Sequence, residues 1–194
     1  MAFLRWKDFL YTFIPILVAM DAVGLVPMYL SLTRGLSDEE RKKVSVQALL
    51  TALVISVIFL GAGKLIFKAI GISLADFTIA GGVLLLVLSV IEMLNLSHAE
   101  KTSTPNVGMV PLGTPLIAGP AVLTSLLILS SYRGYAMTFL SLLVNLLIVA
   151  ISFQQSRRLA QWIGEQGMRA FSQVISLFLA AIAISLIRRG LTAG

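Results

Sequence analysis

The sequence contains no cysteine, one histidine and few charges, with Asp, Glu, Lys and Arg making up 12% of its 194 residues. Without cysteine the chain cannot form a disulfide, use a thiolate nucleophile or hold an iron–sulfur cluster. One histidine and no cluster of carboxylates give no ligand set for a metal ion. We therefore expect no metal and no other cofactor.

Apolar residues dominate what is present. Hydrophobic residues make up 58% of the chain and the mean hydropathy is +0.95, which no soluble domain of this size matches. About 20 consecutive apolar residues span the hydrocarbon core of a bilayer. Segments of this length occur at 9–33, 44–63, 76–96, 109–132, 135–156 and 170–187. The sequence predicts an all-α membrane protein with six transmembrane helices, in contact with the lipid bilayer.

The formal net charge of +6 comes from Lys and Arg scattered among the connections between these segments. Such a distribution is typical of membrane proteins, so we expect no binding of nucleic acid. The cluster at 34–43 is the densest, which predicts a cytoplasmic first loop and both termini outside. In the same loop Ser37 and Glu40 have the spacing of a capping box, which predicts the start of the second helix.

Asp21 lies in the middle of the charge-free stretch 9–33. An ionised Asp near the bilayer centre costs about 2.5 to 3.5 kcal/mol, so such a residue is usually paired, protonated or exposed to a polar cavity. Pro15, Gly24 and Pro27 loosen the backbone near the same depth. We predict a first helix that breaks beside Asp21, with this residue as ligand or coupling group. The alternative is that Asp21 bonds free N–H groups at the break and only stabilises the fold.

Three prolines and two glycines interrupt the fourth predicted span between residues 111 and 120. A proline inside a helix removes a donor and clashes with the preceding turn, so a regular helix cannot continue here. A half-helix beginning at Pro120 would present free N–H groups and the positive end of its dipole to an anion such as a carboxylate. Gly119 and Pro120 are therefore candidate site residues. Pro111 and Pro115 have the alternative role of shaping the loop before the span.

The order of spans repeats along the chain. A broken span, an uninterrupted span and a span opened by polar or small residues occur in residues 1–97 and again in residues 98–194. Because each half has three spans, the second half enters the membrane in the opposite sense. This is the inverted-repeat pattern of secondary transporters, in which paired broken helices indicate the substrate site.

The segments Asp21–Pro27, Ala80–Leu85 and Pro111–Thr124 resemble the MarC/SnatA family of six-span membrane proteins. The resemblance covers nearly the whole chain, and Pro111–Thr124 is its most distinctive part. Ala22 departs from the family pattern, which usually has proline at this place, so we expect a softer break here. The resemblance implies a transporter of small neutral amino acids such as glycine or alanine, driven by an ion gradient.

The candidate substrate site combines residues of both breaks, and Asp21 is also the candidate for ion coupling. Asn145 and Glu92 are secondary candidates, because an amide or a carboxylate within a span can line a cavity. The alternatives are a bond between helices for Asn145 and an interfacial position for Glu92. The substrate-binding candidates are Asp21, Ala22, Gly24, Gly113, Thr114, Pro115, Gly119, Pro120 and Thr124.

These observations predict a secondary active transporter that works by alternating access around a midplane site, coupled to a proton or sodium gradient. We place it in the (inner) membrane of a prokaryotic cell. A passive channel or an exporter of another small solute is the alternative, since a channel shares the broken helices but needs no titratable group. An enzyme is not expected, because no second carboxylate, histidine or nucleophile shares the predicted depth of Asp21. The substrate, the coupling ion and the oligomeric state stay open, with a homo-oligomer as one option.

Overall fold

The protein is described by a computed structural model that covers residues 2–22, 24–33, 35–94 and 108–193. Every regular element within these ranges is helical, as predicted. In chain order the elements are α1 (Ala2–Met20), α2 (Leu25–Leu32), α3 (Asp38–Ile70), α4 (Leu74–Met93), the π-helical segment η2 (Gly108–Ile117), α5 (Pro120–Arg133) and α6 (Tyr135–Ala193).

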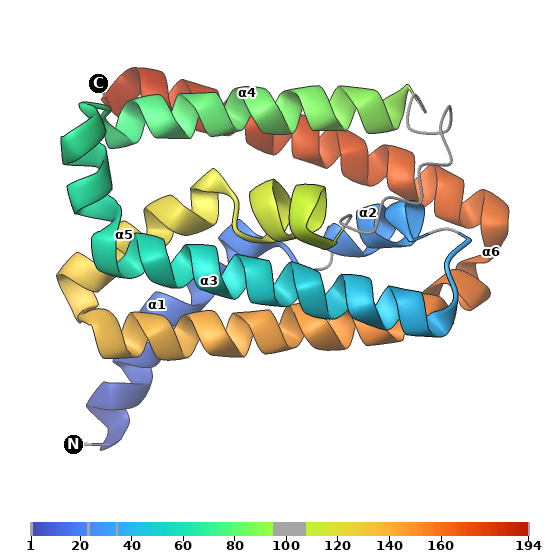
Figure 1. Ribbon diagram of the computed structural model, residues 1–194, viewed down its shortest axis with the longest axis horizontal. Coiled ribbons are helices and arrows are strands. Elements are labelled where there is room, and N and C mark those ends of the chain that lie inside the picture. Colours follow the sequence, from blue (N-terminus) through green and yellow to red (C-terminus); the bar gives the residue numbers. More distant parts are fainter. Residues whose placement is uncertain (1, 23, 34, 95–107, 194) are drawn as a thin grey trace.

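The last helix, α6, contains two of the predicted spans. Figure 1 shows that α6 runs along one side of the molecule, turns, and returns beside α4, so that 135–156 and 170–187 form its outgoing and returning parts. By length and composition, three helical stretches of the described residues can cross a membrane: Asp38–Ile70, Leu74–Ile91 and Tyr135–Ser156. Together η2 and α5 form a fourth, bent by 53°. The count of six spans stays a prediction.

The start of α3 confirms the predicted capping box. The Glu40 N–H donates to Ser37 Oγ at 3.4 Å, and the Ser37 N–H donates to Glu40 Oε2 at 2.8 Å. Backbone N–H groups at a helix N-terminus have no carbonyl partner within the helix. The capping box gives each of these two N–H groups a side-chain oxygen as its acceptor. A second pair of the same kind, Ser73 and Asp76, begins α4.

Glycines bring α4 and the returning part of α6 into close contact. A Cβ at Gly82 would lie 2.8 Å from the Ala183 carbonyl oxygen, and a Cβ at Gly190 would lie 2.9 Å from the Ala75 carbonyl oxygen. The two helices therefore run antiparallel with their backbones nearly touching, the packing that small residues allow in membrane helices. Gly82 therefore serves close packing between helices.

In Figure 1, α2 and η2 lie between the long helices, whereas α1 extends outward from the first break to the N-terminus. Residues of both broken segments, α1–α2 and η2–α5, belong to one buried apolar cluster, including Ile16, Ala22, Ile117 and Val122. The outward faces of the long helices instead expose large apolar side chains, such as Leu65 at 70%. Exposed apolar surface of this extent on several helices fits contact with lipid rather than water.

Candidate binding site at the two helix breaks

The first break confirms the prediction of an interrupted first span. The Asp21 N–H still bonds the Leu17 carbonyl at 3.0 Å, and the Leu25 N–H begins α2 by bonding the Asp21 carbonyl at 3.1 Å. Between them Asp21 adopts a left-handed conformation with φ of 42°. Asp tolerates this region better than most residues because its short polar side chain can bond locally. The helix therefore breaks here although Ala22 does not supply a proline.

The carboxylate of Asp21 is part of the break itself. Its Oδ1 accepts a hydrogen bond from the Gly24 N–H at 3.1 Å. A Cβ at Gly24 would overlap Asp21 Oδ2, so the carboxylate occupies the space that a side chain would need. Ala22 and Gly24 are buried and Asp21 is half-buried. This contact fits the alternative in which Asp21 stabilises the break, and the described hydrogen bond occupies only one carboxylate oxygen.

The second break follows η2. The Ala118 N–H bonds the Gly113 carbonyl at 3.0 Å, Gly119 is extended, and the Leu123 N–H bonds the Gly119 carbonyl at 2.9 Å. The predicted half-helix beginning at Pro120 is confirmed, and no side chain caps its N-terminus. The first N–H groups of α5, from Ala121 on, therefore point toward the break with the positive end of the helix dipole.

Both prolines before this break lie within η2 rather than in a preceding loop. The residues before them, Val110 and Thr114, have extended φ and ψ, and the peptide bonds Val110–Pro111 and Thr114–Pro115 are cis. Gly113 is buried, and a Cβ there would lie 3.0 Å from the Ala48 carbonyl oxygen of α3. Pro111, Gly113 and Pro115 thus shape the approach to the break.

Gly119 and Pro120 are tightly enclosed. A Cβ at Gly119 would lie 2.5 Å from the Pro115 carbonyl oxygen, so only glycine fits this turn. The Pro120 ring packs on Gly81 of α4, where a Cβ would overlap the ring. Gly81 therefore serves close packing between helices, and α4 forms one wall of the second break.

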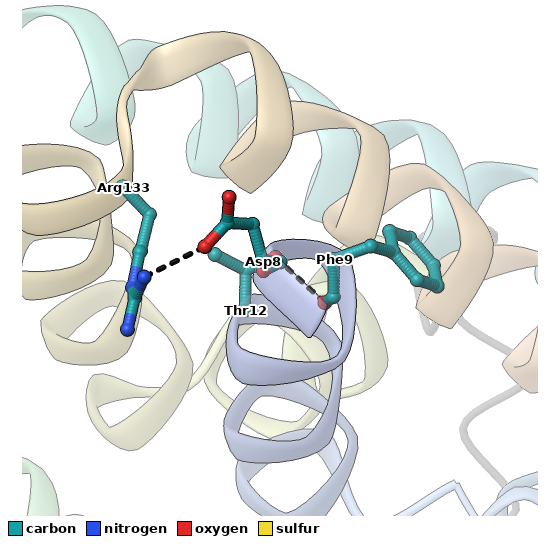
Figure 2. Close-up of polar contacts among 4 residues, drawn as sticks. All are labelled: Asp8, Phe9, Thr12 and Arg133. Carbon is teal, nitrogen blue, oxygen red and sulfur yellow. Dashed lines mark hydrogen bonds and ion pairs between the residues drawn. The ribbon is translucent and has the colours of Figure 1, made fainter. Parts of the chain in front are cut away.

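An ion pair fixes the register between the two broken segments. Arg133, at the end of α5, donates from Nη1 to Asp8 Oδ1 of α1 at 2.7 Å (Figure 2). The guanidinium also lies 4.8 Å from the centroid of the Tyr11 ring. Figure 1 shows that α1 and α5 run in opposite directions, and the two helices pack on each other.

This register places the two breaks on the same side of the ion pair. At about 1.5 Å per residue, Asp21 lies about 20 Å along the chain from Asp8, and Pro120 lies about 20 Å along α5 from Arg133. Because the helices are antiparallel and joined at Asp8 and Arg133, both distances run in the same direction from the ion pair. Asp21 and the N-terminus of α5 therefore each lie about 20 Å from the ion pair, on the same side of it.

Asn145 lies away from Asp21. Its Nδ2 donates to the Phe13 carbonyl of α1 at 3.2 Å and to the Ser141 carbonyl at 2.8 Å. Phe13 precedes Asp21 by about 12 Å along the helix. The alternative role of Asn145, a hydrogen bond between helices, is confirmed. Direct contact between Asn145 and Asp21 is not supported. Glu92 lies in α4, and its side chain falls outside the described part of the chain.

Several buried polar oxygens in the described residues have no hydrogen-bond partner. Burying an unpaired polar atom is costly, so such atoms are rare and indicate ligand or water sites. Three belong to predicted site residues: Thr114, Thr124 and the secondary candidate Asn145. Sequence analysis did not select Ser56 of α3, whose only signal is a hydroxyl on a helix face that turns out to be buried. The atoms are Gln47 Oε1, Ser56 Oγ, Thr114 Oγ1, Thr124 Oγ1 and Asn145 Oδ1.

Helix breaks among buried residues, together with long helices that expose apolar faces, define the protein as a multi-pass integral membrane protein of the α-helical class. Non-helical backbone survives at membrane depth only when protein or a polar cavity shields it from lipid, and both breaks meet this condition. The sequence model described as "MarC family integral membrane protein" matches residues 6–193. The chain belongs to this family.

Relatives in bacteria and archaea match over nearly their whole length. A UPF0056 membrane protein of Methanocaldococcus jannaschii is 30% identical, over 94% of this chain and 95% of the relative. One of Buchnera aphidicola is 28% identical, over 92% of this chain and 89% of the relative. One of Bacillus subtilis is 26% identical, over 93% and 92%. No solved structure matches the chain significantly.

Proposed function

We propose that this protein is a secondary transporter of small neutral amino acids, such as glycine or alanine, driven by a proton or sodium gradient. The observation that carries the proposal is a pair of helix breaks on two segments that pack together, one with Asp21 and the other with the uncapped N-terminus of α5. Paired broken helices of this kind hold the substrate in many secondary transporters.

The two breaks offer chemically opposite partners for a zwitterion. The N–H groups at the start of α5 suit the carboxylate of an amino acid, because the helix dipole favours a negative charge there. The Asp21 carboxylate suits the ammonium group, or a coupling ion. Thr124 lies one turn inside α5 and adds a buried hydroxyl without a partner. The tight packing at Gly24, Gly81 and Gly119 favours a small substrate.

We further propose that residues 1–97 and 98–194 are two inverted repeats of three spans each. The support is a crosswise arrangement of continuous and broken helices. From the first half, α3 follows the broken segment of the second half, with Ala48 against Gly113 and Gly63 against Leu127. From the second half, α6 follows the first broken segment, with Ser141 bonded to Thr12 and Phe153 stacked on Tyr29.

In this proposal, the rocking of one repeat against the other exposes the site alternately to the two sides of the membrane. In this movement α3 keeps η2 and α5 aligned, and α6 keeps α1 and α2 aligned. The two breaks therefore remain opposite each other while the surrounding contacts change. Substrate bound between the breaks thereby moves from one side to the other without an open pore.

Reconstitution into liposomes tests the proposal. Purified protein is assayed with labelled glycine, alanine and leucine under an imposed proton gradient, a sodium gradient or none. We expect accumulation of glycine or alanine above equilibrium under one gradient and much weaker transport of leucine. Uptake that only equilibrates, whatever the gradient, would identify a passive channel instead. No flux of any of the three amino acids would refute the amino-acid assignment.

A further inference from the structure

Ser56 differs from the other buried serines of the described residues. Its side chain is 0% exposed and its hydroxyl has no partner. Buried serines in helices normally donate to a carbonyl in the preceding turn. Ser89, Ser130 and Ser156 do so at 2.6 to 3.0 Å, Ser141 bonds Thr12, and Ser176 also has an interaction partner.

The register of α3 along the second broken segment places Ser56 beside the break. Gly63 packs against Leu127, and from this contact Ser56 and Pro120 each lie about 10 Å back along their own helices. On the N-terminal side of the break, Gly113 packs against Thr51. From this contact, Ser56 lies one to two turns further along α3, and Gly119 lies a similar distance further along the broken segment. Ser56 therefore lies level with the N-terminus of α5.

We infer that Ser56 belongs to the substrate site and donates its hydroxyl to the carboxylate of the bound amino acid, together with the first N–H groups of α5. The inference rests on the proposed function, because it names the partner of that site's anionic group. An unpaired buried hydroxyl destabilises the empty protein, and a bound carboxylate would satisfy it.

The charge of the site decides which end of the substrate Ser56 meets. The α5 N-terminus is the positive end of a dipole, so an anion is favoured at its level and a cation is not. Asp21 belongs to the other broken segment and supplies the negative charge for the ammonium group. A serine hydroxyl can donate to a carboxylate, and a hydrogen bond to a charged acceptor is stronger than one between neutral groups.

Ser56→Ala tests this role, with Ser130→Ala as the matched control, because Ser130 is also buried but bonds the Leu127 carbonyl. Binding of labelled glycine and alanine to the purified protein and the Tm are measured for both variants. We expect Ser56→Ala to weaken binding about tenfold or more while the Tm stays equal or rises. Ser130→Ala should leave binding unchanged and lower the Tm. Ser56→Thr, which keeps the hydroxyl, should retain part of the affinity.

Cysteine labelling gives a readout that does not depend on transport, since the natural chain has no cysteine. We expect Ser56→Cys to react with an anionic methanethiosulfonate faster than with a cationic one, and glycine to slow the reaction. A cysteine that never reacts would show that Ser56 is only core, and would overturn the inference. If the natural protein binds glycine and Ser56→Ala binds it with the same affinity, the inference about Ser56 is overturned and the proposed function is left intact. Wild-type protein that binds neither amino acid would refute both.

Discussion

At the first helix break a charged side chain turns the backbone, whereas at the second the turn is made by glycine and proline alone. Asp21 accepts the Gly24 N–H and adopts a left-handed conformation, so the break depends on a group that can change its charge. At the second break Gly119 is extended, Pro120 begins α5, and the helix N-terminus has no side-chain cap.

From this difference we expect the first break to be responsive and the second to be rigid. We expect a bound cation to alter the first break, because the contact that holds it is a hydrogen bond to a carboxylate. The second break is held by a proline ring and by backbone atoms with little room to move. We expect the first break to sense the ion or the ammonium group, and the second to present a fixed anion site.

The largest effect is expected for Asp21→Asn. Asn also tolerates the left-handed region and can accept the Gly24 N–H, so the break should persist while the charge is lost. In the liposome assay, the initial rate of gradient-driven uptake should fall by about 100-fold, the loss that follows from about 2.7 kcal/mol of missing interaction. If Asp21 only couples the ion, exchange of labelled glycine should continue. If Asp21 holds the ammonium group, glycine binding should weaken as well.

Asp76→Asn is the matched control, because Asp76 lies at the exposed start of α4. The amide oxygen of the introduced Asn can still accept a hydrogen bond from Ser73, as the carboxylate does. It should transport like the natural protein. Full gradient-dependent transport by Asp21→Asn, with an unchanged pH dependence, would show that Asp21 serves only the structure of the break.

The second largest effect is expected on the free energy of unfolding when the glycine at each break, Gly24 or Gly119, is replaced by alanine. Gly119→Ala places a methyl group 2.5 Å from the Pro115 carbonyl oxygen, which is backbone and cannot move aside. Gly24→Ala meets the Asp21 carboxylate, which can rotate away. We expect a loss of about 2 to 3 kcal/mol in the free energy of unfolding for Gly119→Ala and about 1 kcal/mol for Gly24→Ala. Unfolding by denaturant in detergent measures both.

The cause of the smaller loss can be isolated in a double-mutant cycle. Gly24→Ala should cost less in an Asp21→Ala background, because the carboxylate that it displaces is gone. Gly119→Ala should cost the same in either background. Equal coupling of both glycines to Asp21 would contradict the distinction between a responsive and a rigid break.

The smallest effect is expected at the ion pair that joins the two broken segments. Asp8→Asn and Arg133→Gln should each lower the free energy of unfolding by about 0.2 to 1 kcal/mol, because both side chains are more than a third exposed. The double variant should lose no more than the larger single loss plus a few tenths. Tyr11→Leu should matter only while Arg133 is present, since its ring contributes through the guanidinium. Independent, additive losses would argue against the pairing.

Membership of the membrane class, the interrupted first helix and the half-helix at Pro120 could all be predicted from the sequence. Each depends on the chain's own local chemistry: apolar length, the missing N–H of proline, and the cost of a charge in lipid. The capping box at Ser37 and Glu40 was predictable for the same reason, since its partners are three residues apart. The predicted inverted repeat and orientation await their own tests.

What only the tertiary structure decided is the register between helices that are distant in sequence. Hydropathy places Asp21 and Pro120 each near the middle of a span, but the contacts Asp8–Arg133 and Gly63–Leu127 are needed to place them relative to each other and to Ser56. The same is true of Asn145, for which the sequence allowed either a place in a cavity or a bond between helices. Its hydrogen bond to the Phe13 carbonyl is a bond between helices. The physical reason is that packing between helices depends on which small and large residues meet across the contact, and a single sequence does not record its neighbours in space.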